Sequence, residues 1–317
     1  MKIMTEKYRP TTLDNVIGQT DVVQLLKRYV KEQHMTHLLF SGEPGTGKTS
    51  CAMALIKDLY GEDYKFNVLT INASKETGID NIRTKVNHFA MTKMSGDYPF
   101  KIIFLDECDR LSEPSQAALR RVMEQYSEHT RFILSCNYLY KVIKPIQDRC
   151  SLYRFKQLDF DELFEALKNV SETENIKISD DSLRTIAVSS RGSLRRALTT
   201  LEDVTIGSDK GVDDGLVKRV VGQVMTDTQT LELIKMVKEG DYFKLQDEMY
   251  RLRSLGVPPE EIIEDIMYGY ERTDTDVKTK MLITAKCADY DYRICMGANP
   301  QVQLMAFFRD LMKLESG

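Results

Sequence analysis

The chain has 317 residues, of which 42% are hydrophobic and 29% charged, so it is long enough for two or three folded domains. Its formal net charge of -4 gives no overall field that would attract nucleic acid, so any contact with DNA must come from a local basic patch. The six cysteines contain no C-x-x-C pair and only four histidines are present, which argues for reduced thiols and against a zinc site.

The chain also lacks the patterns of a secreted or membrane protein. Its first residues, Met1–Glu6, contain no apolar signal region. No apolar run approaches the roughly 18 residues that a membrane helix needs. We therefore expect a protein without a membrane partner, located in the cytoplasm or, in a cell that has one, in the nucleus.

The first predicted elements are an irregular opening and a helix. The opening contains the run Glu6–Pro10. The helix covers about residues 21–33, where apolar side chains recur at helical spacing. The apolar run Leu38–Phe40 then predicts a strand.

The segment Gly42–Thr49 follows that strand and fits the phosphate-binding pattern G-x-x-x-x-G-K-[ST]. Its glycines allow a tight turn in which consecutive backbone N–H groups point at phosphate oxygens. Lys48 would bring a positive charge to the β- and γ-phosphates, and Thr49 would bring a hydroxyl to Mg²⁺. The helix that begins at about Lys48 would direct its positive end at the same anion. This pattern predicts a site for a nucleoside triphosphate with Mg²⁺.

Further strands are predicted by four apolar runs, at residues 67–71, 101–105, 131–135 and 151–155. Strands that alternate with helices pair in parallel, and buried parallel strands are continuously apolar, as these are. We therefore expect a five-stranded α/β sheet with helices on both faces, within a first domain at 1–155. The rest of the chain shows only helical patterns, which predict a small helical domain at 156–222 and a second one at 223–317.

Two carboxylates, Asp106 and Glu107, end the strand predicted at 101–105. Asp106 would hold Mg²⁺ through its water shell, and Glu107 would polarise an attacking water, because phosphoryl transfer depends on positioning and on neutralisation of charge. The alternative is a pair of acids exposed where a strand emerges. Their pairing with a phosphate-binding loop favours the hydrolytic role.

Three more polar residues are candidates for the same site. Asn137 follows a predicted strand that lies beside the one carrying Asp106, and its amide could orient water or sense the γ-phosphate. By itself, an Asn in this place is more often a turn former. Arg149 and Arg195 are cations of the kind that stabilises charge on a transferred phosphoryl group, from the same subunit or from a neighbour. The residues themselves leave open which arginine does which.

Together these residues resemble the AAA+ ATPases, and among them the small subunits of replication factor C, the archaeal and eukaryotic sliding-clamp loaders. The resemblance extends over nearly the whole chain. Besides Gly42–Thr49 and the pair Asp106-Glu107, it is carried by residues 6–10, Gly18-Gln19, 116–124, 148–150 and 192–196.

The resemblance implies a ring-like pentamer of a large subunit and small subunits. Such a ring uses ATP to bind and open a sliding clamp, and releases the clamp on primer–template DNA as hydrolysis proceeds. By its motif, Asn137 is sensor 1, Arg195 is sensor 2 within the same subunit, and Arg149 reaches the ATP of a neighbour. The segment Tyr8–Ile17 would lie against the adenine.

Motifs and resemblance together predict three sets of site residues. Those that bind ATP are Tyr8, Arg9, Val16, Ile17, Gly42, Glu43, Pro44, Gly45, Thr46, Gly47, Lys48, Thr49, Ser50, Asn137 and Arg195. Those that act in catalysis are Lys48, Asp106, Glu107, Asn137, Arg195 and, in trans, Arg149. Those that hold Mg²⁺, partly through water, are Thr49 and Asp106.

The chain departs from the family pattern at three positions. Asp148 stands where the family usually has Ser, and an acid beside Arg149 would change how strongly that arginine is presented. Glu43 replaces a usual Pro or similar residue, and Cys108 replaces the commoner Ala. None of these changes removes a catalytic side chain.

Two predicted helices carry the expected partner surfaces. In residues 79–89 the apolar side chains share one face and Arg83 and Lys85 lie off it. The resemblance implies that these two cations contact the phosphates of primer–template DNA, and the alternative is a solvated helix face. A later helix ends with Met123 and Tyr126, where the resemblance implies a clamp-binding tip, although a Met and a Tyr at this spacing are more often core residues.

The leading hypothesis is an ATP-hydrolysing clamp-loader small subunit that is active only in an oligomer. A second is a scaffold subunit of the same ring that binds ATP without hydrolysing it, against which the intact Glu107 argues. A third is another AAA+ DNA motor, such as a branch-migration helicase, which would lack the Glu6–Pro10 pattern. Beyond residue 223 no catalytic pattern is present, and the resemblance implies a helical collar that holds the subunits together.

Overall fold

The structure is a computed structural model, and it describes residues 3–74, 79–206, 211–221 and 227–315. The chain divides into two compact units, Met1–Glu202 and Asp203–Gly317. Among the described residues, no helix is both long enough and apolar enough to cross a membrane.

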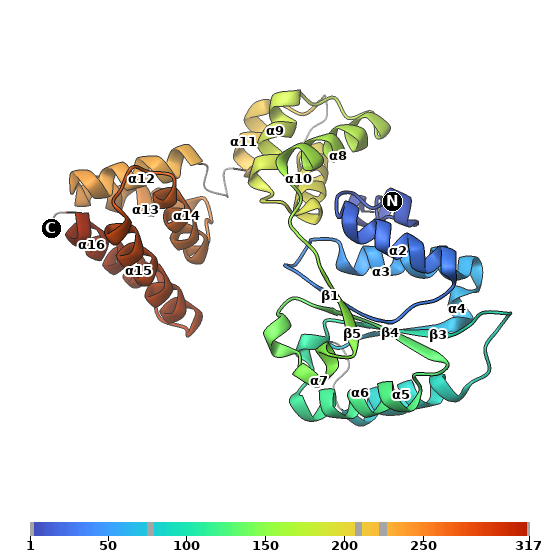
Figure 1. Ribbon diagram of the computed structural model, residues 1–317. Coiled ribbons are helices and arrows are strands. Elements are labelled where there is room, and N and C mark those ends of the chain that lie inside the picture. The colour runs from blue at the N-terminus through green and yellow to red at the C-terminus, as the bar shows by residue number, and fades with distance from the viewer. Residues whose placement is uncertain (1–2, 75–78, 207–210, 222–226, 316–317) are drawn as a thin grey trace. The chain divides into compact units, whose positions relative to one another are not determined.

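A five-stranded parallel sheet lies at the centre of the first unit, with the strand order β2-β3-β4-β1-β5 (Figure 1). Its strands are β1 (His37–Ser41), β2 (Val68–Asn72), β3 (Lys101–Asp106), β4 (Thr130–Cys136) and β5 (Cys150–Arg154). Every predicted strand is confirmed, with its bounds displaced by no more than one residue. The prediction succeeds because these strands are buried on both faces and are therefore apolar along their length.

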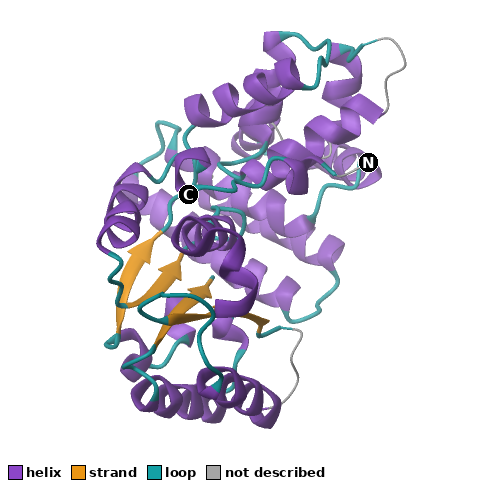
Figure 2. Ribbon diagram, turned by 90° about the vertical axis from the view of Figure 1, so that its right-hand side faces the viewer, coloured by secondary structure: helices purple, strands orange, loops and turns teal. Residues whose placement is uncertain are grey.

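Helices cover both faces of this sheet, as the sequence predicts. In chain order, the helices up to the end of the sheet are α1 (Met4–Lys7), α2 (Thr20–Glu32), α3 (Lys48–Tyr60), α4 (Tyr64–Asn67), α5 (Ile79–Met91), α6 (Glu113–Gln125) and α7 (Lys144–Gln147), and those that follow the sheet are α8 (Phe160–Thr173), α9 (Asp180–Ser189) and α10 (Leu194–Ile206). Short 3₁₀ turns lie at Leu13–Asn15, Gly61–Asp63, Cys108–Arg110 and Leu139–Lys141. Helices α2 and α3 lie on one face, and α5 and α6 lie on the other (Figures 1 and 2).

Strand β3 shows how the two faces are packed. Successive side chains of a strand point to opposite faces of the sheet. Ile102 and Phe104 accordingly join the buried cluster of α2 and α3. Ile103 and Leu105 join the cluster that contains side chains of α5 and α6. The sheet is therefore held rigidly from both sides, and the residues at the ends of its strands are fixed relative to one another.

The turn before α10 is fixed to the linker that follows the sheet. The Leu158 N–H donates to the Gly192 carbonyl at 3.1 Å. Gly192 has a φ of +76°, and a Cβ added there would lie 2.5 Å from the Cβ of Gln157. A side chain at this position would therefore be both strained and obstructed. This contact fixes where α10 begins, and with it the position of Arg195.

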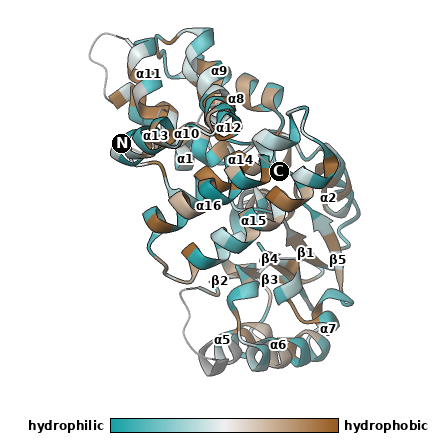
Figure 3. Cartoon of the chain, turned by 90° about the vertical axis from the view of Figure 1, so that its left-hand side faces the viewer, coloured by the Kyte–Doolittle hydropathy of each residue, from teal (hydrophilic) through white to brown (hydrophobic). Residues whose placement is uncertain are grey.

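In the described part of the second unit, all the secondary structure is helical. Its helices are α11 (Asp214–Val221), α12 (Asp227–Glu239), α13 (Tyr242–Ser254), α14 (Pro259–Glu271), α15 (Val277–Cys295) and α16 (Pro300–Glu315). Hydrophobic and hydrophilic residues alternate along them (Figure 3). The apolar faces of α12 to α16 meet in a core that includes Ile266, Tyr270 and Phe307. The predicted division between the two helical domains, at 222–223, lies outside the described residues and stays a prediction.

His37 makes the stability of the sheet depend on pH. The Phe132 N–H donates to His37 Nδ1 at 3.1 Å. Burial, together with the nearby Arg131 guanidinium, lowers the pKa of His37 to about 4, from an ordinary value of 6.5. The neutral form is thus favoured in the folded state. The unfolded chain binds more protons between about pH 6.5 and about pH 4, so the stabilisation is complete above this range and is lost as the pH falls through it.

We therefore expect the free energy of unfolding to fall by up to about 2 kcal/mol, through this group alone, between about pH 7 and about pH 5. The variant His37→Asn keeps an acceptor for the Phe132 N–H but has no group that titrates there. Urea denaturation of both proteins at the two pH values measures the difference. An equal loss of stability in the variant would show that His37 does not cause it.

Candidate active site

A cavity in the first unit brings together four parts of the chain: the N-terminal segment, the loop after β1, the ends of β3 and β4, and the start of α10. All the residues predicted to bind the nucleotide or to act on it line this cavity, except Gly42, Glu43 and Arg149. The sequence did not single out Ser135, Leu158 or the apolar residues of α10, which also line it. The fold thus assembles the predicted residues in one place, while their roles stay predictions.

The loop between β1 and α3 needs its glycines for two separate reasons. Gly45 and Gly47 have φ angles of +87° and +93°, in the left-handed region that favours glycine. A Cβ added to Gly45 would lie 2.4 Å from Ser193 Oγ, and one added to Gly42 would lie 2.4 Å from the Phe155 carbonyl oxygen. The loop is therefore held tightly against the segments on either side, and its backbone is free of side chains where a phosphate would approach.

Lys48 is the buried cation of the site. Its side chain is 7% exposed, and Nζ donates to the carbonyls of Gly42 and Glu43, each at 2.7 Å. Burial lowers the pKa of Lys48, although Asp106 acts in the opposite direction. These carbonyls carry no full charge. A bound phosphate would therefore supply the counter-charge that the buried ammonium lacks.

A cluster of oxygen atoms joins α3 to the ends of β3 and β4. Thr49 Oγ1 donates to the carboxylate of Asp106, at 3.1 Å and 3.0 Å to its two oxygens. The Ser135 hydroxyl donates to the same carboxylate and accepts the Glu107 N–H at 3.1 Å. Ser135 therefore orients both predicted acidic residues. No local signal singles it out, because β4 also contains the polar residues Thr130 and Arg131.

The Thr49 and Asp106 side chains fit a magnesium ion. They provide a hydroxyl and a carboxylate, the hard oxygen ligands that Mg²⁺ takes. Among the described residues, no group of three or more His, Cys, Asp or Glu side chains could hold a metal on its own. Mg²⁺ usually keeps several waters and binds through one or two carboxylates and the phosphates of its nucleotide. The residues present suit this mode, and the ion would neutralise phosphate charge when bound.

Glu107 has an unusual backbone conformation. Its φ and ψ are 57° and 43°, in the left-handed region, although it is not a glycine or an asparagine. Such a conformation costs on the order of 1 kcal/mol and persists only where the surroundings hold it. Here the Glu107 N–H is bonded to Ser135, and the residue lines the cavity with Asn137. This strain fits a carboxylate that is held ready for a bound substrate.

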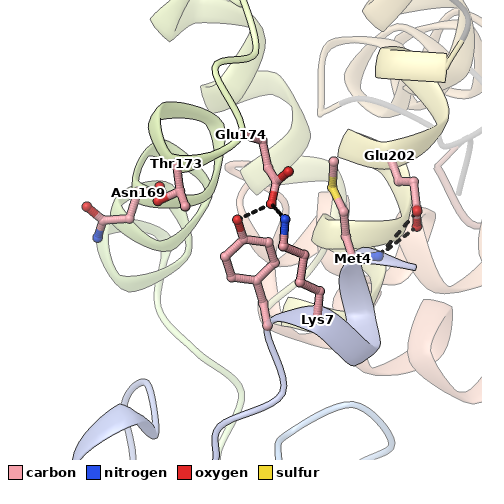
Figure 4. A network of polar contacts seen from close by, with 7 residues as sticks. Met4, Lys7, Asn169, Thr173, Glu174 and Glu202 are labelled. Atoms are coloured by element: carbon pink, nitrogen blue, oxygen red, sulfur yellow. Dashed lines mark hydrogen bonds and ion pairs between the residues drawn. The ribbon is translucent and has the colours of Figure 1, made fainter. Parts of the chain in front are cut away.

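The N-terminal wall of the cavity is tied to the helices that follow the sheet (Figure 4). Lys7 Nζ lies 2.5 Å from the carboxylate of Glu174, which also accepts a hydrogen bond from the Tyr8 hydroxyl. Burial and this hydrogen bond raise the pKa of Tyr8 to about 12, so its hydroxyl stays protonated. The Met4 N–H donates to Glu202 at 3.2 Å. The wall and α8 and α10 are thereby joined.

Comparison with known proteins identifies the family. Residues 38–158 match the ATPase family associated with various cellular activities (AAA), 165–205 match the RCF1/5-like AAA+ ATPase lid domain, and 225–308 match the replication factor C C-terminal domain. The replication factor C small subunit of Methanococcus maripaludis is 40% identical over 315 residues, which is 99% of both chains. The chain belongs to the replication factor C small subunits. The subunit of Archaeoglobus fulgidus is also 40% identical, over 99% of this chain and 98% of its own.

Solved structures with the same fold come from another member of the AAA+ class. RuvB of Thermotoga maritima, a Holliday junction branch migration motor, has a TM-score of 0.58 at 19% identity, over 73% of this chain and 79% of its own. A variant of RuvB reaches 0.60 at 20% identity, over 87% and 98%. At this identity the likeness shows the fold alone. The full-length relatives at about 40% identity place this small subunit in replication factor C.

Arg149 lies outside the cavity of its own chain, after α7. Its Nη1 donates to the Pro145 carbonyl at 2.8 Å, and its Nη2 pairs with Glu124 on α6. Arg195, by contrast, lines the cavity and lowers the pKa of Lys48 through its charge, although burial is the larger cause. The residue types alone could not distinguish the two arginines. In this small subunit Arg195 lines the cavity and Arg149 lies outside it.

The predicted partner surfaces have different outcomes. The Arg83 side chain lies outside the described residues, and Lys85 is exposed on α5 and has an interaction within the chain. The expectation of an exposed tip at Met123 is wrong, because its side chain is fully buried in the core beneath α6. Tyr126 is half-buried and packs against the same core. Of this pair, only Tyr126 keeps surface for a partner.

Replacing Ser135 by Ala should slow ATP hydrolysis far more than it weakens ATP binding. The change removes a hydrogen bond from the Asp106 carboxylate and leaves the Glu107 N–H without its acceptor, while the loop around Lys48 is untouched. A buried unsatisfied group costs about 1–3 kcal/mol, which corresponds to a fall in kcat of about tenfold to a hundredfold. Steady-state ATPase assays of the assembled protein and equilibrium ATP binding measure the two effects.

Ser151→Ala is the matched control for this substitution. Ser151 is the second residue of β5, and its hydroxyl bonds to that of Thr36 at 2.9 Å, at the amino-terminal ends of the strands. We expect this variant to hydrolyse ATP at the wild-type rate. Equal rates for Ser135→Ala and wild type would show that the Ser135 hydroxyl does not orient the acidic pair.

Proposed function

We propose that the chain is an ATP-hydrolysing subunit of a ring-shaped loader that opens a sliding clamp and places it on primer–template DNA. Family membership and the cavity both support this proposal. The observation that carries it is the composition of the cavity, which combines Lys48, Thr49, Asp106 and Glu107 in one chain. Arg149, the second arginine that the sequence singles out, lies outside the cavity and contacts Pro145 and Glu124.

Each residue has a task that suits its place. Lys48 would neutralise the β- and γ-phosphates, while Thr49 and Asp106 would hold Mg²⁺. Glu107 would polarise the attacking water, and Asn137, the residue after the neighbouring strand, would orient it. These tasks need positioning rather than covalent chemistry, so a rigid sheet edge with fixed side chains is sufficient. The intact Glu107 in the cavity disfavours a scaffold that binds ATP without turnover.

The catalytic arginine would come from the next subunit. Arg149 is half-exposed on the surface of its own chain, and an arginine supplied in trans stabilises the charge that develops on a transferred phosphoryl group. Arg195 would act within the chain, since it lines the same cavity as Lys48. Hydrolysis would then occur only between subunits. A ring of the large subunit and further small subunits, held by the C-terminal helices, would provide these contacts.

Contact with DNA would be made through the phosphate backbone. Lys85 and Arg83 on α5 are the candidates, and the formal net charge of -4 means that several subunits must add their contacts. Backbone contacts carry no information on base sequence, which suits a protein that must act at any primer end. Tyr126 is the remaining candidate for contact with the clamp.

Mixing two inactive variants tests the shared site. Lys48→Ala should abolish ATP binding in its own chain but leave its Arg149 intact, whereas Arg149→Ala should bind ATP normally and fail to hydrolyse it. In a random equal mixture of the two, a quarter of the interfaces pair an intact cavity with an intact arginine. We therefore expect each variant alone to lose about a thousandfold in ATPase rate, and the mixture to recover about a quarter of the wild-type rate.

The measurement is ATPase turnover with primer–template DNA and a sliding clamp present, before and after subunit exchange. Recovery below the detection limit, with exchange verified by mass, would argue against an arginine supplied in trans. Full activity of a monomer would do the same. Turnover that does not respond to the clamp would favour another AAA+ motor instead.

A further inference from the structure

The carboxylate of Glu124 on α6 lies between two arginines. It accepts from Nη2 of Arg149, and Arg120 Nε lies 3.8 Å from the same oxygen. The other end of the Arg149 guanidinium is also held, because Nη1 donates to the Pro145 carbonyl at 2.8 Å. The guanidinium, at the end of a partly exposed side chain, is therefore held at two points by its own chain.

We propose that Glu124 is a positioning residue for Arg149, which holds its guanidinium in the orientation that meets the nucleotide of a neighbouring subunit. This inference rests on the proposed role of Arg149 in trans. Glu124 does not line the cavity of its own chain, and its carboxylate pairs with Arg120 and Arg149. It acts through Arg149 alone.

The hydrogen bonds leave Arg149 able to bind a phosphate. A guanidinium has five N–H donors, and the contacts with Glu124 and Pro145 use two of them. The Arg149 side chain remains 37% exposed. A free arginine loses rotamer entropy when it is fixed. Because Glu124 and Pro145 fix Arg149 before a neighbour's nucleotide arrives, that cost does not fall on the hydrolytic step.

The charges around Arg149 favour positioning over neutralisation. Arg120 and Arg149 share the single negative charge of the Glu124 carboxylate, so this acid cannot neutralise both arginines. Asp148, the acid that departs from the family pattern, pairs with Lys144 at 3.1 Å instead of with Arg149. Together these pairs contain three cations and two anions, so their net charge is +1. They are Arg120, Lys144 and Arg149, with Glu124 and Asp148. A neighbour's phosphates would therefore meet a positive surface.

Stability of the fold does not account for this arrangement. The side chains of Arg149 and Glu124 are 37% and 42% exposed, and ion pairs at such sites contribute little to folding. Removing Glu124 should therefore leave the unfolding transition in place and change the rate of hydrolysis. This separates a positioning role from a structural one.

The mixed assembly described above gives a direct test with the full-length chain. In that mixture the working arginine comes only from the Lys48→Ala chain, and the working cavity only from the Arg149→Ala chain. Glu124→Ala on the Lys48→Ala chain should lower the recovered kcat about tenfold, with the KM for ATP unchanged. The same substitution on the Arg149→Ala chain should leave the recovered rate unchanged.

Two further variants sharpen this test. Glu124→Gln on the Lys48→Ala chain should keep most of the rate, because its amide oxygen can accept the same hydrogen bond. Glu128→Ala is the control for loss of a negative charge near the end of α6, since Glu128 is exposed and its carboxylate lies 3.7 Å from His129 Nε2. It should leave the recovered rate unchanged on either chain.

The outcomes separate this inference from the proposed function. Recovery that is unaffected or increased by Glu124→Ala on the Lys48→Ala chain would overturn the positioning role and leave the trans arginine standing. An equal fall from either chain would assign Glu124 a structural role and would also overturn it. A parent mixture without any recovery would overturn the trans arginine, and the inference with it.

Discussion

The register of the parallel sheet is the constraint on which the site depends. Strand pairing sets Phe40 opposite Ser135 and Asn72 opposite Asp106, and it sets Leu105 opposite Leu134, one residue before Asp106 and Ser135. Because parallel strands end at the same edge, the loop after β1 and the polar ends of β3 and β4 meet there. A slip of one residue would turn these side chains to the opposite face of the sheet and would separate Ser135 from Asp106. The two apolar clusters that fix the register are therefore also what holds the catalytic geometry.

The remainder of the cavity comes from segments that the sheet does not position. Tyr8 reaches Glu174 across 166 residues of chain, and the Leu158–Gly192 hydrogen bond fixes the start of α10. These contacts are few, polar and partly exposed, so each contributes little to folding. Their effect is to tie the N-terminal wall to the helices that follow the sheet, so that Arg195 on α10 lines the same cavity as the wall and the loop.

This division also explains what could be predicted from the sequence. The strands and the loop could be found because continuous apolar runs and a fixed glycine spacing are local signals. Ser135 could not be found in advance, since a single serine in a strand takes its meaning only from the carboxylate beside it. The surface tip at Met123 was implied by the resemblance, although its spacing is more often that of a core residue, and the packing of α6 on the sheet confirms the core position. The hydrogen bond between Tyr8 and Glu174 joins two segments that are far apart in the sequence. Neither segment contains a pattern that predicts contact with the other.

The fold by itself does not decide what this chain does. A branch migration motor has the same architecture at about 20% identity, and phosphate loop, acidic pair and sheet follow from the common physics of holding a nucleotide. The family is shown instead by the full-length relatives and by the Glu6–Pro10 segment, part of which lines the cavity. Outside the cavity, Arg149 is held by Glu124 and Pro145 on the surface of the first unit. Under the proposed function, an arginine held at the surface and outside the cavity of its own chain would make hydrolysis depend on contact between subunits as well as on bound nucleotide.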